Sequence, residues 1–146
     1  MKKLLLAALV VAGLASSAFA TDVTKVSSKA QTSFESKFGN ATNVQWTARE
    51  GYNKVTFTLA DEQVEAFFAT DGDLIGFSRN AAFKSLPLAA IQKIKKEYAA
   101  YTVKETIEFE QNEEKSFYVS LENGDKKLIL EVSLFGNVSV YRGKAK

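Results

Sequence analysis

The sequence predicts an α+β fold made of two tandem repeats, each a helix followed by a four-stranded antiparallel sheet, with the helices packed on one sheet face. Two observations support this prediction. Apolar residues change along the chain from a spacing of about four, typical of a helix, to alternation, typical of a half-buried strand, and this order occurs twice. Short segments rich in Gly, Asn and Asp separate the alternating runs, as expected of hairpin turns.

The first twenty residues have the organisation of a secretory signal peptide. Two lysines precede an apolar run over residues 4–14, and the sequence Ala-Phe-Ala at 18–20 suits cleavage by a signal peptidase. The apolar run is shorter than the roughly 20 residues that span a bilayer. We therefore expect residues 1–20 to be removed. One domain over 21–146 would then reach the periplasm or the medium, without a stable membrane anchor.

The composition narrows the classes of function. The signal peptide holds two of the 19 basic residues, which leaves 17 basic against 17 acidic in the mature domain. A neutral domain has no general attraction to phosphate backbones or anionic lipid, so we expect no nucleic acid partner. The basic residues Lys93, Lys95 and Lys96 are expected to be solvated. Because the chain has no Cys, stability must come from a packed core.

The first repeat is expected over about residues 27–80. Its helix begins at Ser28, where Gln31 three residues later resembles a capping box, and ends at Gly39. Asp71-Gly72-Asp73 has the composition of a tight turn between the third and fourth strands. The strands themselves are expected near 44–46, 55–59, 64–69 and 74–79.

The second repeat is expected over about residues 85–142. Pro87 suits the first turn of its helix, with Ser85 or Leu86 as the cap, because a first-turn N–H has no partner within the helix. The apolar stripe of this helix is Leu88, Ile91, Ile94, Tyr98 and Tyr101. Strands are expected at 103–110, 117–122, 127–132 and 138–141.

The two repeats can be aligned residue by residue. Residues 55–59 correspond to 117–121, and Gly72 corresponds to Gly136. The first correspondence has an offset of 62 residues and the second of 64, and the two extra residues fall in the turn at 123–125. At the offset of 64, the inward positions 64, 66 and 68 match 128, 130 and 132. We interpret the chain as a tandem duplication.

Three segments resemble those of a known family. They are residues 38–46 (Phe-Gly-Asn-Ala-Thr-Asn-Val-Gln-Trp), residues 66–74, and Leu86-Pro87 with the helical positions 91, 94 and 98. They resemble the exported PepSY-like domains, whose fold is compared with that of the bacterial β-lactamase inhibitor protein. The resemblance covers nearly the whole mature chain. It implies two helix-plus-sheet halves, with helices on one face and an open sheet face free for a protein partner.

The chain departs from the family pattern in two places. Gly39 stands where the family often has a proline, and Leu134-Phe135-Gly136-Asn137 replaces the usual acidic Asp-Gly turn. The resemblance does not imply inhibition of β-lactamase, because the inhibitor's loop residues and disulfides have no counterpart here. No functional residue is therefore carried over from the family.

The residue types argue against an enzyme. Without His and Cys, the Ser-His and Cys-His arrangements and most zinc sites are excluded. Glu108 and Glu110 share a strand face, so a carboxylate-based hydrolase is a weak alternative, although an alternating polar strand face is far more often simply solvated. The Asp71-Gly72-Asp73 turn lacks the further ligands of a calcium loop. We expect no catalytic residues, no metal and no cofactor.

Phe67, Tyr118 and Ile129 are the candidate partner-binding residues. Strand alternation places each on the sheet face opposite its inward-pointing neighbours. Aromatic and aliphatic anchors on an open sheet are typical of protein-binding hot spots, so we expect an exposed patch. The alternatives are coverage by the N-terminal leader or a second copy, or cross-strand pairs that stabilise the sheet. A register shift of one residue would exchange Phe67 for Phe68.

These observations predict an exported, non-enzymatic protein-binding module. It would modulate or inhibit a secreted or periplasmic hydrolase through its open sheet face, a role that rests on analogy of fold. The alternative is a self-associating structural protein of the envelope.

Overall fold

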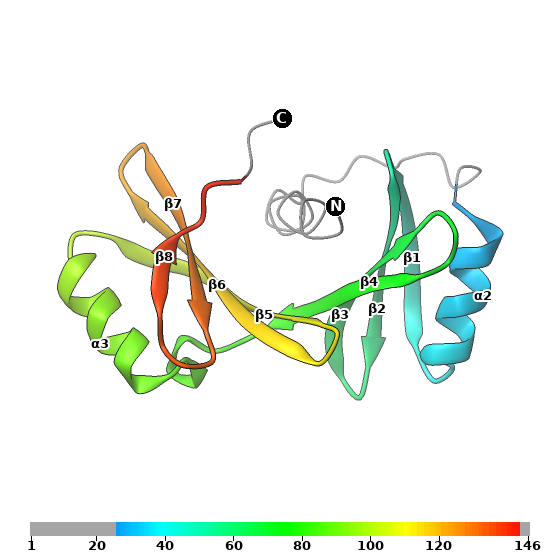
Figure 1. Cartoon of the computed structure of the whole chain (residues 1–146), viewed down its shortest axis with the longest axis horizontal. Helices are drawn as coiled ribbons and strands as arrows, with labels where there is room; N and C mark the ends of the chain where they lie inside the picture. Colours follow the sequence, from blue (N-terminus) through cyan, green and yellow to red (C-terminus); the bar gives the residue numbers. More distant parts are fainter. Residues whose placement is uncertain (1–25, 144–146) are drawn as a thin grey trace. The chain divides into compact units, whose positions relative to one another are not determined.

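The structure, a computed structural model, describes residues 26–143 of the chain, so the predicted signal peptide lies outside the described residues. The chain divides into two compact units at Arg79 and Asn80. Each unit is a helix followed by four consecutive antiparallel strands (Figure 1), which confirms the predicted fold class. Within 26–143, no helix is both long enough and apolar enough to cross a membrane.

The strands of unit 1 follow chain order as an antiparallel meander. Its elements are α2 (Ser28–Lys37), β1 (Thr42–Arg49), β2 (Tyr52–Leu59), β3 (Glu62–Ala69) and β4 (Leu74–Asn80). Ala60 and Asp61 both have positive φ in the two-residue turn between β2 and β3. This conformation matches the twist of paired strands and fixes their register.

The helix cap of unit 1 differs from the prediction. The N-cap is Ser27, whose Oγ accepts a hydrogen bond from the N–H of Ala30 at 3.4 Å. The same hydroxyl donates to the carbonyl of Thr70 at 2.7 Å. Ser28 is already helical, so the predicted capping box at Ser28 is wrong. Two adjacent serines offer the same chemistry, and the contact with Thr70 selects between them.

An aromatic cluster forms the core of unit 1 between α2 and the sheet. Phe34 lies at its centre, with ring centroids 5.0 to 6.3 Å from those of its four aromatic neighbours. These neighbours are Phe38, Trp46, Phe57 and Phe68. Burying large rings in edge-to-face contact stabilises the helix on the sheet, beyond what its own short length provides.

Unit 2 repeats this plan with an extra 3₁₀ turn. Its elements are η2 (Phe83–Ser85), α3 (Leu88–Glu97), β5 (Thr102–Gln111), β6 (Glu114–Asn123), β7 (Lys126–Ser133) and β8 (Val138–Val140). Pro87 is itself the N-cap of α3 and makes no side-chain cap, so neither Ser85 nor Leu86 takes that role. The stripe prediction is wrong for Leu88, which is 69% exposed, whereas Ile94 is buried as expected.

The internal repeat extends to the helices. Ala30 and Ala90 occupy the same helical position and are both fully buried, and Phe34 corresponds to Ile94. Three of the seven buried core residues of unit 1 are aromatic, against one of the eight in unit 2, so the core of unit 2 is the more aliphatic of the two. Its buried members are Leu86, Ala90, Ile94, Phe117, Val119, Leu121, Leu130 and Val132.

Candidate protein-interaction surfaces

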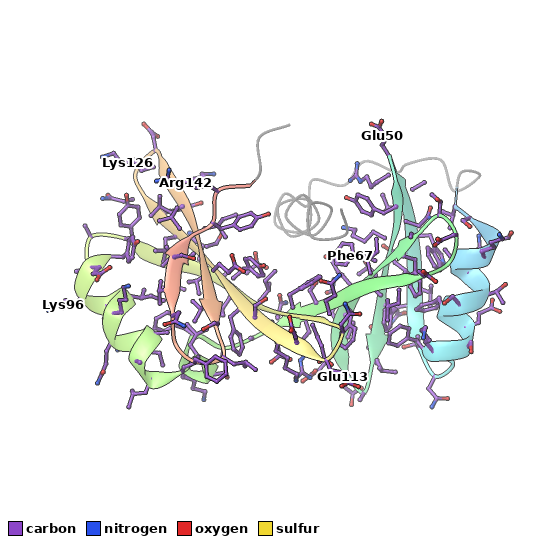
Figure 2. All side chains as sticks on the ribbon, viewed as in Figure 1. Glu50, Phe67, Lys96, Glu113, Lys126 and Arg142 are labelled. Atoms are coloured by element: carbon purple, nitrogen blue, oxygen red, sulfur yellow. The ribbon has the colours of Figure 1, made fainter. Side chains whose placement is uncertain are left out.

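Phe67 lies on the face of the unit 1 sheet opposite α2 (Figure 2), as predicted. Its neighbours Ala66 and Phe68 both belong to the helix-side core. The ring of Phe67 is 6.2 Å from that of Tyr52, and Phe67 pairs across the strands with Lys54. Phe67 is only 1% exposed, so the expectation of an exposed anchor at this position is wrong. Strand alternation identifies the face of a side chain but not what packs against it.

An ion pair accompanies Phe67 on this face. Lys54 Nζ lies 3.3 Å from Glu65 Oε1, and both side chains are largely covered. Removing one partner of such a covered pair would leave an uncompensated charge and destabilise the fold. The open face of unit 1 is therefore a packed aromatic and charged layer.

Tyr118 and Ile129 lie on the corresponding open face of unit 2. The hydroxyl of Tyr118 donates to Glu131 at 3.4 Å, and its ring meets that of Tyr141 edge to face at 5.4 Å. Tyr118 is 4% exposed, so the expectation of exposure is also wrong here, whereas Ile129 is half-buried. Binding of a partner by Phe67, Tyr118 and Ile129 stays a prediction.

Tyr118 and Tyr141 of unit 2 both have a raised pKa, which favours their neutral form. Burial raises the pKa of Tyr118 to about 12, and the nearby charge of Glu131 acts in the same direction. The same two causes raise the pKa of Tyr141. Burial also raises the pKa of Tyr52 in unit 1, and the charge of Arg49 opposes that shift. Hydroxyls with raised pKa values are poor general bases near neutral pH, so this geometry favours packing over acid–base chemistry.

Glu108 and Glu110 are joined by one lysine. Lys115 Nζ lies 3.2 Å from Glu108 Oε1 and 3.5 Å from Glu110 Oε2. The hydrogen bond from Lys115 to Glu108 is the largest cause of a raised pKa of the lysine. A hydrolytic pair requires two carboxyl groups in environments that separate their pKa values. Here one cation contacts both groups, which favours a structural ion pair.

No metal site is evident in the part of the chain that the structure describes, where no group of three or more Asp or Glu side chains is placed to hold an ion. In the turn Asp71-Gly72-Asp73, Asp71 Oδ1 accepts from the N–H of Asp73 at 3.1 Å. The aspartate therefore stabilises the turn itself.

Among the described residues of unit 2, three of the five exposed large apolar side chains lie in the turn between β7 and β8 or at the start of α3. Phe135 is 90% exposed and Leu134 50% exposed in the turn between β7 and β8. The turn between β7 and β8 lies near the start of α3 (Figure 1). A Cβ at Gly136 of this turn would lie 3.1 Å from the Ala89 methyl. Leu88 precedes Ala89 and is also exposed. We call Leu88, Leu134 and Phe135 the apolar turn patch.

Hydrogen bonds hold this turn in one conformation. Ser133 N–H donates to the carbonyl of Asn137, and Gly136 N–H donates to the carbonyl of Ser133, both at 3.0 Å. The hydroxyl of Ser133 accepts from the N–H groups of Phe135 at 3.3 Å and Asn137 at 3.2 Å. Phe135 therefore projects from a well-defined backbone.

A groove of about 370 Å³ lies beside α2 and β1 in unit 1. Its lining residues are Gln31, Phe34, Glu35, Phe38, Gly39, Ala41, Val44 and Trp46. Val44 is 40% exposed at the rim, and the pairing of β1 with β2 is irregular between Thr42 and Gln45. Asn43 within this bulge has φ of 53°, and the bulge bends the start of the strand.

Sequence reasoning missed both the patch and the groove as sites. The replacement of an acidic turn by residues 134–137 was visible, and it was the one local signal for the patch. The groove has no local signal because it depends on how α2 and β1 pack at their ends.

Solved structures of proteins from Bacteroides species share the fold of this chain. A DUF2874 family protein from Bacteroides uniformis matches with a TM-score of 0.69 at 14% identity, covering 76% of this chain and 84% of that one. A candidate periplasmic protein from Bacteroides eggerthii also matches with a TM-score of 0.69, at 13% identity over the same shares of the two chains.

A BLIP-like protein from Bacteroides fragilis matches with a TM-score of 0.66 at 21% identity, covering 77% of this chain and 82% of that one. No protein-family model matches the sequence, and no curated protein is similar to it. At these identities the likeness concerns the fold alone. The resemblance predicted from the sequence is therefore confirmed as a fold: the chain has the PepSY-like, BLIP-like architecture of these Bacteroides proteins.

Proposed function

We propose that the mature chain is an exported, non-enzymatic protein-binding module that docks its partner through the apolar turn patch. The observation that carries this proposal is Phe135, an aromatic side chain that is 90% exposed on a turn held by hydrogen bonds. Exposed aromatic anchors contribute most of the free energy at many protein interfaces. Because the backbone is already ordered, binding loses little conformational entropy.

Two of the solved structures with this fold support an exported location for the protein. One solved neighbour is described as a candidate periplasmic protein and another as BLIP-like. Together with the signal-peptide pattern at residues 1–20, they favour export of this chain. Modulation of a secreted or periplasmic hydrolase is the role that the analogy of fold favours.

The turn patch is a better anchor than the open sheet faces. Phe67 and Tyr118 are almost fully buried, so a partner would have to displace their present neighbours to reach them. Phe135 is already in contact with solvent, and covering its ring would remove apolar surface from water directly. Ile129 is half-buried and would contribute at the margin of an interface.

The test is capture from periplasmic and secreted fractions of the source organism, using mature protein and Phe135→Asp as bait, followed by titration with the purified partner. Lys126→Gln is the matched control, because it changes the net charge by the same amount at another exposed position, the first residue of β7. We expect Phe135→Asp to weaken binding by about 30-fold, the equivalent of a hot spot of about 2 kcal/mol. Equal affinity of both variants would exclude the patch.

A further inference from the structure

We infer that the mature chain binds a second copy of itself head to tail, with Phe135 of one copy seated in the α2–β1 groove of the next. This inference rests on the proposed function, since it takes Phe135 as a protein-binding anchor, and deepens it by naming the partner. It differs from pairing of open sheet faces because two unlike surfaces meet.

The groove has the chemistry to take an aromatic ring. Phe38 and Trp46 line it, and their ring centroids lie 5.6 and 5.4 Å from that of Phe34. A further ring would extend this cluster by the same edge-to-face and offset contacts, each worth about 0.5–1.5 kcal/mol beyond area burial. The small residues Gly39 and Ala41 leave the lining open. Its volume of about 370 Å³ is within the range of pockets that enclose ligand groups.

The charges of the two units are complementary. Residues 21–79 contain six basic and eight acidic side chains, whereas residues 80–146 contain eleven basic and nine acidic ones. Contact between unit 2 of one copy and unit 1 of another therefore joins opposite net charges, whereas contacts between like units join equal ones. Glu35 places one of the acidic groups at the groove itself.

The geometry predicts assembly beyond a dimer. Each copy carries one anchor and one groove, and a single head-to-tail contact uses the anchor of one copy and the groove of the other. The pair keeps a free anchor and a free groove, so further copies add until a ring closes or a chain continues. Face-to-face pairing of sheets would stop at two copies.

The experiment measures the mass of the mature protein by light scattering over a range of concentrations, together with the fluorescence of Trp46. Trp46 is the only tryptophan of the chain and lines the groove, so its emission reports occupancy directly. We expect mass to increase with concentration and the emission to shift to shorter wavelength. Circular dichroism of each variant first establishes that it is folded.

Two variants then test the anchor and the groove one at a time. Phe135→Asp removes the anchor, and Val44→Asp places a charge at the exposed rim of the groove. We expect each variant alone to lose at least about tenfold in association constant. Their mixture should form a dimer that does not grow, since one variant still has its groove and the other its anchor. The Lys126→Gln control makes the same change of charge in unit 2, so we expect it to lose much less in association constant than Phe135→Asp.

A wild-type chain that stays monomeric at all concentrations overturns the inference. So does a closed dimer, or assembly that survives both substitutions. If the chain is monomeric while a foreign partner still needs Phe135, the inference fails and the proposed function stands. If neither self-association nor foreign binding depends on Phe135, both fail.

Discussion

The turn between β3 and β4 and the turn between β7 and β8 share a backbone but differ in chemistry. In the first, Ala69 N–H donates to the carbonyl of Asp73 at 2.8 Å. In the second, Ser133 N–H donates to the carbonyl of Asn137 at 3.0 Å. Thr70 and Asp71 of the first turn are polar, whereas Leu134 and Phe135 at the same positions of the second are apolar. The fold therefore needs the backbone of this turn and leaves its exposed side chains free to vary.

Both turns rest on the helix of their own unit through a glycine. Gly72 has φ of 97° and approaches Lys29, and Gly136 has φ of 85° and approaches Ala89. Lys29 and Ala89 hold corresponding positions in α2 and α3. This contact explains why the glycine is shared by the two repeats although its neighbours are not.

The backbone N–H groups of the two turns also donate to different side chains. In unit 1 the carboxylate of Asp71 accepts from the N–H of Asp73. In unit 2 the hydroxyl of Ser133 accepts from two N–H groups of the turn, so the position equivalent to Asp71 is released from this role. Phe135 occupies that position and points into solvent. The hydroxyl of Ser133 therefore leaves the side chain at position 135 without a role in the hydrogen bonds of the turn.

The largest loss of stability is expected when the buried helix residue of each core is shortened. These residues are Phe34 in α2 and Ile94 in α3, which hold the same helical position. Phe34→Ala removes a ring that packs against four others and should destabilise the protein by about 4 kcal/mol. Ile94→Ala in the same helical position of unit 2 should lose about 3 kcal/mol. Urea unfolding of both variants measures the difference. A larger loss for Ile94→Ala would contradict the ranking of the two cores.

The next largest loss of stability is expected when the glycine of either turn is replaced by alanine. Gly72→Ala and Gly136→Ala should each destabilise by about 1–3 kcal/mol, because alanine disfavours positive φ and its methyl meets the helix. Gly72→Ala should be the more destabilising of the two. Its Cβ would lie 2.9 Å from the backbone carbonyl oxygen of Lys29, whereas a Cβ at Gly136 would meet the side-chain methyl of Ala89.

Thermal unfolding of the two alanine variants compares these losses. Gly124→Ala is the control, because it has positive φ with no atom near its Cβ and therefore reports backbone strain alone. Equal losses at all three glycines would show that contact with the helices contributes nothing.

Alkaline pH should lower the free energy of unfolding through Tyr118 on the open face of unit 2. Below pH 10 Tyr118 is neutral in both states. Between pH 10 and about 12 the unfolded chain ionises at this residue while the folded chain keeps the proton, so stability falls as pH rises. The loss is expected to reach roughly 2 kcal/mol. Denaturant unfolding across this range should show a shallower fall for Tyr118→Phe, and equal slopes would rule out a pKa near 12.

The smallest effect is expected from exchanging the turn residues. Phe135→Asp should change the free energy of unfolding by no more than about 0.5 kcal/mol, because the ring is exposed. Asp71→Phe should lose about 1 kcal/mol, since it removes a hydrogen bond within the turn. Differential scanning calorimetry compares the two variants. A marked loss for Phe135→Asp would mean that its ring supports the fold.

Local patterns in the sequence determined the order of the elements, the internal repeat, and the face on which Phe67 and Tyr118 lie. They succeed because helix and strand periods are set by backbone geometry, which is read from neighbouring residues. Only the tertiary structure decided that Phe67 is buried, that Ser27 and not Ser28 caps α2, that Phe135 is exposed, and that a groove opens beside β1. Each of these depends on which distant segment packs against a residue, and such contacts leave no trace in a local pattern.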